Sequence, residues 1–479
     1  MDISGFNKKI AQLRKKADIS LKALGEMVGA SARTVSKWEN GTAMPSVENL
    51  IKLSQVFGVS TDEMLGIGEQ KPQRLHTDGM PSIRELYKIG SGPSSSHTIG
   101  PERASQIFGE KNADADEFKV ILYGSLAKTG KGHCTDVVII KTFAPKKCRI
   151  EFDVIKSDLP HPNTMELFAY KNGEQIDYAR VFSVGGGAIR FEGEAAQEHA
   201  PELVYPHTTF GEIADYCKKN GKRLWQYVFD HEGEGFKAYM AEIWRAMKRA
   251  IMEGLEDEGI LPGGLNVHKK AKYLYNLQHL DETAETRSNR LISAYAFAVG
   301  EQNACGGTIV TSPTCGAAGV VPAVMYFQQL KGGFSDDEII RALATGGLIG
   351  NLIKTNATIS GAEGGRQAEI GSACAMAAAA MAELYELTVS KIEYSAEIAI
   401  EHHLGLTCDP ICGLVQIPCI ERNAVAAMRA INAVNLSAFL SDTRKISLDK
   451  VIVAMRETGH DIDRQYRETS EGGLAKIQV

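Results

Sequence analysis

The stretch EHHLGLTCDPICGLVQIPCIERN, residues 401–423, organises the sequence on both sides of it. It holds three of the nine cysteines, close behind a pair of histidines, and apolar, helix-compatible sequence flanks it. Asp409-Pro410 and Pro418 interrupt the helical pattern. We therefore expect the thiols of Cys408, Cys412 and Cys419 to lie on turns between helices, facing a buried pocket.

This clustering of thiols has two interpretations. In a reducing compartment it favours a soft metal or an iron–sulfur centre over disulfides. The other interpretation is that these cysteines are small buried hydrophobes, as most free cysteines are. Their spacing matches neither a zinc ribbon nor a ferredoxin run, so the spacing alone leaves both open. The histidine pair His402–His403 is equally open between a site and a polar helix face.

The composition bounds the class of protein. With 479 residues the chain can form two or three domains, and 44% hydrophobic with 23% charged residues is ordinary for a soluble protein. The net charge of −6 argues against wholesale coating by nucleic acid. The start MDISGFNKKIAQL has no apolar signal core, and no uncharged run reaches membrane-spanning length. We expect a cytoplasmic protein without a membrane partner.

Residues 1–66 read as a domain of short helices, because apolar residues recur at helical spacing. Gly29 is placed to end the second helix, Ser31 to cap the third, and Trp38 to anchor the core. The run SLKALGEMVGASARTVSKWENG (residues 20–41) resembles the Cro/repressor type of helix-turn-helix domain.

That resemblance implies a DNA partner, read by the helix around Ser31–Trp38 in the major groove. The implied contacts are Arg33, Thr34, Ser36 and Lys37. A helical protein–protein module is the competing interpretation. Such DNA-binding domains work on paired half-sites, so we expect a homodimer.

Residues 67–80 read as a polar linker, and residues 81–228 as an α+β domain. Strands are predicted at Phe118–Tyr123, Asp136–Lys141 and Arg149–Val154, and a helix is predicted to start at Pro101–Phe108. The loop GSGPSSSHTIGP, residues 90–101, surrounds His97 with hydroxyls and flexible backbone, which can converge on an anion such as a carboxylate.

Residues 229–479 read as a mainly all-α domain. The run CAMAAAAMAELY (residues 374–385) offers small residues for close helix packing, and charges interrupt every apolar run, which argues against a membrane hairpin.

A series of motifs in order links these segments. Besides GLTCDPICGLVQIPCIERNA, the chain contains KIGSGPSSSHTIGPERA, YGSLAKTGKGH, HPNTM, SVGGGAI, TSPTCGAAG, KTNATISGAEGG and YRETSEGGLA. In these motifs the chain resembles the iron–sulfur-dependent L-serine dehydratases (L-serine ammonia-lyases). The resemblance covers about four fifths of the chain and implies that the β-type and α-type segments are fused in one polypeptide.

The resemblance implies an activity and a set of residues. L-serine would lose its β-hydroxyl with help from a [4Fe-4S] cluster, and no pyridoxal phosphate would take part. The implied catalytic residues are His97, Ser95 and Lys354. The implied substrate contacts are Ser94, Ser96, Thr98, His161 and Asn163.

The metal site departs from the family pattern. The resemblance implies Cys408 and Cys419 as two ligands, and places the third in a motif G-C-Q-x-E-[VI]-G that reads GRQAEIG here, with Arg366 at the cysteine position. Arginine cannot ligate iron. We take Cys315 as the substitute ligand; the other candidates are Cys412, Cys374 and Cys305, and a protein without a cluster is a further alternative.

Three hypotheses follow. The first is an iron-assisted L-serine ammonia-lyase with a DNA-binding domain for regulation. The second is a serine-sensing transcription regulator built on a disabled dehydratase, in which Arg366 holds the serine carboxylate. The third, which we disfavour, is a pyridoxal-phosphate enzyme with Lys354 as the Schiff base and Gly185–Gly187 around the phosphate.

Overall fold

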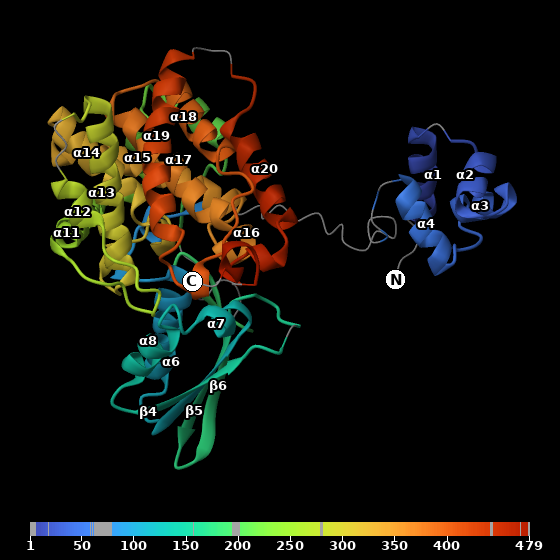
Figure 1. Ribbon diagram of the computed structural model, residues 1–479, viewed down its shortest axis with the longest axis horizontal. Coiled ribbons are helices and arrows are strands. Elements are labelled where there is room, and N and C mark those ends of the chain that lie inside the picture. The colour runs from blue at the N-terminus through green and yellow to red at the C-terminus, as the bar shows by residue number, and fades with distance from the viewer. Residues whose placement is uncertain are drawn as a thin grey trace. The chain divides into compact units, whose positions relative to one another are not determined.

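The chain folds into two compact units, Met1–Leu75 and His76–Val479, which are described separately. The structure, a computed structural model, describes residues 6–57, 59, 61, 79–193, 202–277, 281–440 and 444–477, apart from positions 18, 157 and 470 (Figure 1). Nearly all of the linker expected at 67–80 lies outside the described residues. No helix among the residues described is both long and apolar enough to cross a membrane.

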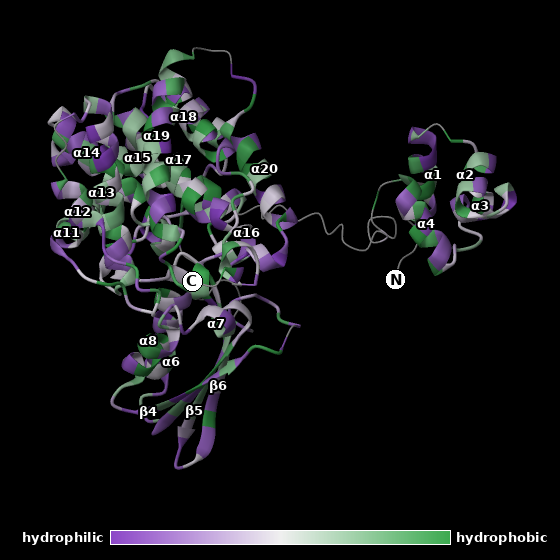
Figure 2. Cartoon of the chain, in the orientation of Figure 1, coloured by the Kyte–Doolittle hydropathy of each residue, from purple (hydrophilic) through white to green (hydrophobic). Residues whose placement is uncertain are grey.

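The smaller unit is helical, as predicted. Its helices are α1 (Phe6–Lys16), α2 (Leu21–Val28), α3 (Ala32–Glu39) and α4 (Val47–Phe57). They alternate hydrophobic and hydrophilic residues in Figure 2, and the apolar faces close around a core of Phe6, Ile10, Leu24, Val28, Val35, Trp38 and Leu53.

The caps of the smaller unit follow the sequence signals. Gly29 ends α2 in the left-handed conformation, with φ 76°. Ser31 caps α3, because its hydroxyl accepts a hydrogen bond from the backbone N–H of Thr34. The predicted end of the second helix, the predicted start of the third and the place of Trp38 in the core are confirmed.

The first part of the larger unit contains a five-stranded sheet in the order β4-β3-β5-β6-β7. The strands are β3 (Glu117–Tyr123), β4 (Lys147–Asp153), β5 (Thr164–Lys171), β6 (Glu174–Gly185) and β7 (Ala188–Phe191). Only the β3–β4 pair is parallel, and α7 (Gly124–Thr129) and α8 (Thr135–Phe143) connect its strands. Helix α6 (Gly100–Lys111) packs with α8 against the sheet through a shared apolar core (Figure 1).

One predicted strand is wrong. Residues 136–141 form part of helix α8, although their β-branched run is typical of a strand. Ile139 and Phe143, four residues apart, are buried against the sheet, whereas Val137 and Ile140 are 60% and 47% exposed. The burial therefore follows the helical period, which the uniformly apolar run VVII conceals. The strands expected near 118–123 and 149–154 and the helix starting near 101 are confirmed.

The rest of the larger unit is mainly helical. Two short antiparallel strand pairs join its early and later segments. Strand β1 (Met80–Pro81) pairs with β8 (Leu203–Tyr205), and β2 (Ile89–Ser91) pairs with β9 (Thr308–Val310). Its α-helices are α9 (Phe210–Asn220), α10 (Leu224–Glu232), α11 (Phe236–Glu256), α12 (Ala271–Asn276), α13 (Ala284–Ala304), α14 (Val320–Gly332), α15 (Asp336–Asn356), α16 (Gly361–Gly364), α17 (Ser372–Leu384), α18 (Val389–Glu401), α19 (Cys419–Phe439) and α20 (Leu448–Asp461).

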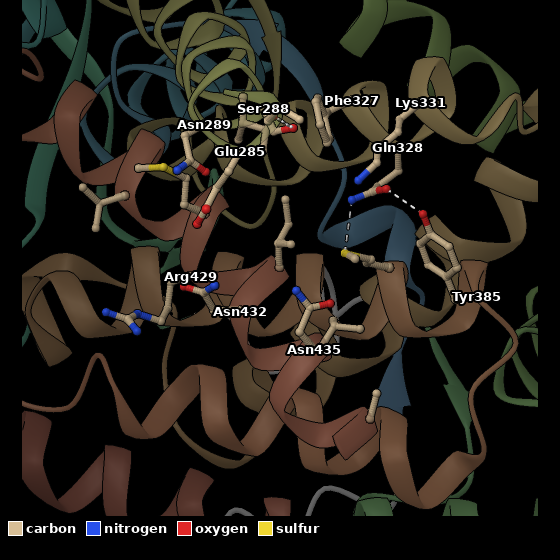
Figure 3. A pocket seen from close by; sticks show the side chains of 18 of the residues that line it. Glu285, Ser288, Asn289, Phe327, Gln328, Lys331, Tyr385, Arg429, Asn432 and Asn435 are labelled. Atoms are coloured by element: carbon tan, nitrogen blue, oxygen red, sulfur yellow. Dashed lines mark hydrogen bonds between the residues drawn. The ribbon is translucent and has the colours of Figure 1, made fainter. Parts of the chain in front are cut away.

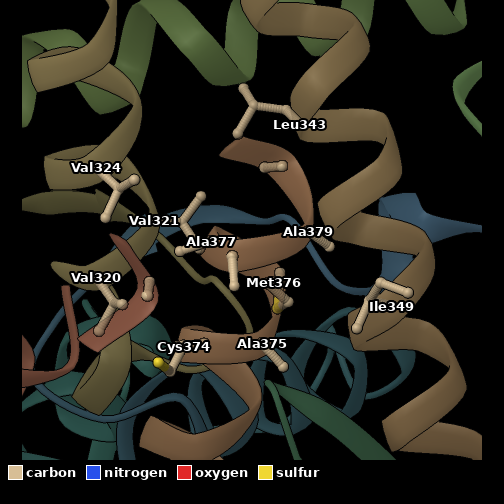
Figure 4. Packing of buried hydrophobic residues seen from close by; sticks show 14 of the residues in the cluster. Val320, Val321, Val324, Leu343, Ile349, Cys374, Ala375, Met376, Ala377 and Ala379 are labelled. Atoms are coloured by element: carbon tan, nitrogen blue, oxygen red, sulfur yellow. The ribbon is translucent and has the colours of Figure 1, made fainter. Parts of the chain in front are cut away.

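Helix α17 is the centre of this helical part. Every one of its residues is buried, and it packs against α14 and α15 (Figure 4) and against α18 and α19. The close approach depends on small residues: a Cβ atom at Gly346 of α15 would lie 2.7 Å from the carbonyl oxygen of Met376. The predicted close packing of the alanine-rich run is confirmed.

Replacing Gly346 with alanine tests this packing. The added methyl group meets backbone that cannot move alone, so we expect the free energy of unfolding to fall by about 1–3 kcal/mol. Gly211→Ala in α9 is the matched control, because its Cβ would meet its nearest atom at 3.6 Å; there we expect a gain of about 0.5–1 kcal/mol. Calorimetric melting of the full chain measures both, and an equal effect at the two positions would contradict close packing at α15–α17.

Candidate functional site

His97 lies at the centre of a buried polar cluster. Ser94 caps a π-helical turn, Ser95–Ile99, by accepting a hydrogen bond from the backbone N–H of His97 at 3.1 Å, and this turn leads into α6. The side chains of residues 94–98 are all buried, and the hydroxyl of Thr98 donates to the carbonyl of His133 at 2.8 Å. Ser95 opens the turn, and its carbonyl accepts from the backbone N–H of Gly100.

The hydrogen bonds around His97 fix its tautomer. The hydroxyl of Ser125 donates its single hydrogen to the carbonyl oxygen of Glu468 at 2.7 Å, and also lies 3.0 Å from Nε2 of His97. It must accept there, so Nε2 of His97 carries the ring proton. Nδ1 is then the free base, 2.9 Å from the hydroxyl of Ser96. Burial lowers the pKa of His97 to about 4, so the ring is neutral at neutral pH.

A carboxyl group faces the free nitrogen of this histidine. Oε1 of Glu468 lies 3.6 Å from Nδ1 of His97. Burial, with the neighbouring carboxylate of Glu369, raises the pKa of Glu468 to about 8, although the charge of Arg366 opposes this. The backbone N–H of Glu468 donates a hydrogen bond to the carbonyl of Cys408 at 2.8 Å, and this pairing holds Glu468 in place. The tail of the chain and the cysteine loop therefore meet at His97.

His161 and Asn163 lie on a neighbouring loop. Nδ1 of His161 accepts from the backbone N–H of Asn163 at 3.0 Å, which leaves the proton on Nε2 to face the carboxylate of Glu363 at 3.2 Å. The side chain of Asn163 reaches the carbonyl of Ser183 at 3.4 Å. The glycine turn 185–187 packs against the segment that leads to Glu363, since a Cβ at Gly185 would lie 3.2 Å from that of Ser360.

Arg366 is buried beside the two cysteines. Its Nη1 donates to Oε2 of Glu369 at 2.5 Å, and its Nη2 lies 2.7 Å from the sulfur of Cys419. The other oxygen of Glu369 accepts from the hydroxyl of Thr314 at 2.7 Å. Gly365, with φ 72°, precedes Arg366 at the turn between α16 and the π-helical turn Gln367–Gly371. The guanidinium is thus held between a carboxylate and a thiol.

The cysteines named as candidate ligands differ in burial and in contacts. Cys408, which bridges to Arg467, and Cys315, which opens a 3-10 turn, are buried, and Cys419 is the first residue of α19. Cys412 and Cys305 are exposed, and the thiol of Cys374 faces the carbonyl of Ala426 at 3.3 Å. Over the described ranges, no group of three or more histidine, cysteine, aspartate or glutamate side chains could hold a metal ion.

The [4Fe-4S] cluster implied by the resemblance does not fit this arrangement. Two of its implied ligands, Cys408 and Cys419, are present, but the guanidinium of Arg366 contacts the sulfur of Cys419 and lies near that of Cys408. The structure does not gather Cys315 with them as a third ligand.

Unpaired polar atoms gather around His97. Of the sixteen buried side-chain nitrogen and oxygen atoms that lack a hydrogen-bond partner among the described residues, seven belong to this region. We call them the unpaired polar set: His133 Nδ1, Asn163 Oδ1, Ser183 Oγ, Ser360 Oγ, Arg366 Nε, Arg467 Nε and Glu468 Oε2. Because buried polar groups are normally hydrogen-bonded, this concentration indicates a place for a small polar ligand.

Other predicted residues lie apart from these contacts. Nζ of Lys354 faces the carbonyl of Glu85 at 3.3 Å, and burial lowers its pKa to about 8. His402 and His403 each bond through Nδ1 to a carbonyl of α18.

In the smaller unit, Arg33 and Lys37 are exposed on α3, Thr34 and Ser36 are half-buried, and Val35 and Trp38 face the core.

Several residues of the site were not predicted, although they occur within the quoted motifs. Ser125 and His133 are in YGSLAKTGKGH, and Arg467 and Glu468 are in YRETSEGGLA. The hydrogen bond from Ser125 to Glu468 joins positions 343 residues apart, a pairing that the sequence does not indicate.

The larger cavities of the helical part lie elsewhere. A groove of about 840 Å³ opens between α13, α14, α17 and α19, lined by polar side chains such as Asn289, Gln328 and Asn432 (Figure 3). The groove lies towards the start of α13 and the ends of α14 and α17, whereas the opposite ends of these helices lead to the His97 region. It takes no part in the site.

Comparison with known proteins gives three family matches. Residues 172–475 match the model described as serine dehydratase alpha chain, and residues 82–149 match serine dehydratase beta chain. Residues 10–64 match a helix-turn-helix family.

Curated relatives cover most of the chain. It is 38% identical to L-serine dehydratase 1 of Escherichia coli (strain K12) over 453 residues, 83% of this chain and 100% of that protein. The L-serine dehydratase of Streptomyces coelicolor is 38% identical over 82% of this chain and 98% of its own length. The L-serine dehydratase of Haemophilus influenzae is 37% identical over 83% of this chain and 99% of its own length.

Ser125→Ala tests the link between His97 and the tail. The change leaves Nε2–H of His97 and the carbonyl of Glu468 without their partner, so we expect the free energy of unfolding to fall by about 1–3 kcal/mol. In the control Ser293→Ala, the lost hydroxyl bonds a carbonyl of its own helix, and the expected change is near zero. Equal stability of the two variants in calorimetric melting would show that the link is absent.

Proposed function

The chain belongs to the serine dehydratase family, and we propose that its larger unit is an L-serine ammonia-lyase, joined to a DNA-binding unit. The observation that supports this most directly is the unpaired polar set around His97, formed by the motifs that the chain shares with the family. The curated relatives, which bear the name L-serine dehydratase, agree with it.

The chemistry of the unpaired polar set suits L-serine. Two arginine Nε–H groups, of Arg366 and Arg467, are donors for a carboxylate. Oδ1 of Asn163 and Oε2 of Glu468 are acceptors for an ammonium group. The hydroxyls of Ser183 and Ser360 can form hydrogen bonds with the hydroxyl of the ligand. A small zwitterion with a hydroxyl would satisfy groups of both kinds at once.

The residues at the site suggest how each proton moves. His97 is neutral and its Nδ1 carries no proton, so this nitrogen accepts the α-proton of serine. The β-hydroxyl needs a proton in order to leave as water, and the carboxyl of Glu468, which faces the same nitrogen at 3.6 Å, is the group placed to give it. The resulting enamine tautomerises and is hydrolysed to pyruvate and ammonia. Because the iron–sulfur cluster does not fit, no step passes through it.

The smaller unit is proposed to bind DNA through α3. Arg33 and Lys37 are exposed where a recognition helix presents its side chains, and Thr34 and Ser36 lie beside them. The unit has only two more basic than acidic residues over 1–66, so its affinity depends on two copies reading paired half-sites. We therefore propose that the chain acts as a homodimer.

A second candidate function is a serine-responsive regulator that binds serine without converting it. The position of Arg366 favours it, because the guanidinium lies where the family has a cysteine and contacts the remaining thiol of Cys419 at 2.7 Å. In this case serine would change the affinity for DNA while its bonds stay intact.

Pyruvate formation separates the two candidates. We expect the full chain to form pyruvate from L-serine, and His97→Ala to lower kcat by about 100-fold or more, since general-base catalysis contributes at least that factor. His268→Ala, at an exposed histidine outside the site, is the control and should leave kcat unchanged. A full chain that binds serine in calorimetry and forms no pyruvate would replace the lyase by the regulator.

The DNA-binding proposal has its own test. Selection from random DNA with the full chain should enrich a sequence with two related half-sites. For that sequence we expect Arg33→Ala and Lys37→Ala each to weaken binding by about tenfold, because each removes a charged contact. Lys52→Ala, which only breaks an exposed pair with Glu48 on α4, should bind normally. Enrichment of no sequence, or equal losses in all three variants, would remove α3 as the reading element.

A further inference from the structure

The guanidinium of Arg366 is buried and held in place by contacts with neighbouring side chains. The residue is 3% exposed, and two of its three nitrogens are engaged, one with Glu369 and one with the sulfur of Cys419. An arginine keeps its charge under all ordinary conditions, and a buried charge is stable only with a partner of opposite sign. Glu369 supplies that partner, and Thr314 fixes the carboxylate from the other side.

The surrounding backbone leaves room for this pair and little else. A Cβ at Gly316 would lie 2.6 Å from Nη1 of Arg366 and 3.0 Å from Oε1 of Glu369. A Cβ at Gly361 would lie 2.7 Å from Oε2 of Glu369 and 3.4 Å from the sulfur of Cys408. The ion pair therefore fills the space between two glycines and the thiol, which is where a cluster held by the two cysteines would have to be.

The third nitrogen of the same guanidinium is free. Nε of Arg366 is buried and has no partner among the described residues. The charge of Arg366 acts on Glu468 and on His133, whose ring lies 4.4 Å from that of His97. The free N–H thus belongs to the region where the proposed function places the ligand, and a buried donor without a partner costs free energy that a carboxylate would recover.

We propose that Arg366 takes the place of the metal centre in this chain: the chain carries no iron–sulfur cluster, and the guanidinium holds the carboxylate of L-serine through Nε–H. The first half of this inference concerns the chain alone. The second half rests on the proposed function, because it assumes that serine is the ligand. In this site the guanidinium of Arg366, paired with Glu369, stands in place of an oxygen-sensitive iron–sulfur cluster.

Iron content tests the first half. The full chain, purified without oxygen and reconstituted with iron and sulfide, should retain essentially no iron and show no visible iron–sulfur absorption. Arg366→Cys should gain both, because it restores a third thiol beside Cys408 and Cys419. Arg245→Cys, which adds a thiol on the exposed face of α11, is the control and should stay free of iron. A cluster in the unaltered chain, or a folded Arg366→Cys protein without iron, would overturn the inference.

Calorimetric binding of L-serine tests the second half. The unaltered chain should bind serine equally well with and without a strong chelator. Arg366→Lys keeps a positive charge but lacks the Nε donor, so we expect binding to weaken by about 10- to 100-fold, the factor that a hydrogen bond to a charged group contributes. Arg245→Lys is the matched control and should bind as the unaltered chain does. Loss of binding in chelator, or unchanged binding by Arg366→Lys, would contradict this half.

These measurements separate the inference from the proposed function. A chain that binds serine through Arg366, holds no iron and forms no pyruvate would support the inference and remove the lyase. A chain that forms pyruvate only with reconstituted iron would keep the lyase and remove the inference.

Discussion

A buried guanidinium held between a carboxylate and a thiol is the constraint on which this site depends. Arg366 cannot lose its charge, so it needs the neighbouring side chain of Glu369 as its partner, and the surrounding loops must stay closed around the pair. Gly316 and Gly361 leave the space that the pair fills. Glu468 and Cys408, which pair through their backbones, then bring the tail of the chain to the same place. His97 receives its carboxyl neighbour from this tail.

The helical core makes that closure possible. Helix α17 is buried throughout and packs on four other helices, with glycine and alanine at the closest approaches. Helices α17 and α19 both begin at the site, and α13 ends there, so the site is built at helix ends on a rigid frame. The sheet part contributes the π-helical turn of His97, helix α7 with Ser125, and the loop of His161. Neither part has the complete set of polar groups without the other.

The sequence predicts this site unevenly. The loop around His97 and the cysteine loop were recognisable, because glycine, serine and proline mark loops whose polar groups converge. Glu468 was not. Its role comes from a left-handed backbone conformation, from backbone pairing with Cys408 and from a hydrogen bond with Ser125, which is 343 residues away in the sequence. The helix at Thr135–Phe143 was mistaken for a strand because four adjacent apolar residues hide the period of burial. The substitution at Arg366 was visible in the sequence, but the carboxylate that neutralises it was identified only from the contacts in space.

A crystal structure of the full chain with bound L-serine tests the central claim most directly. The account predicts the carboxylate of serine within hydrogen-bonding distance of Nε of Arg366, the α-carbon facing Nδ1 of His97, and no metal between Cys408 and Cys419. Serine bound to a metal centre at those two cysteines, with the side chain of Arg366 turned away from Glu369, would contradict it.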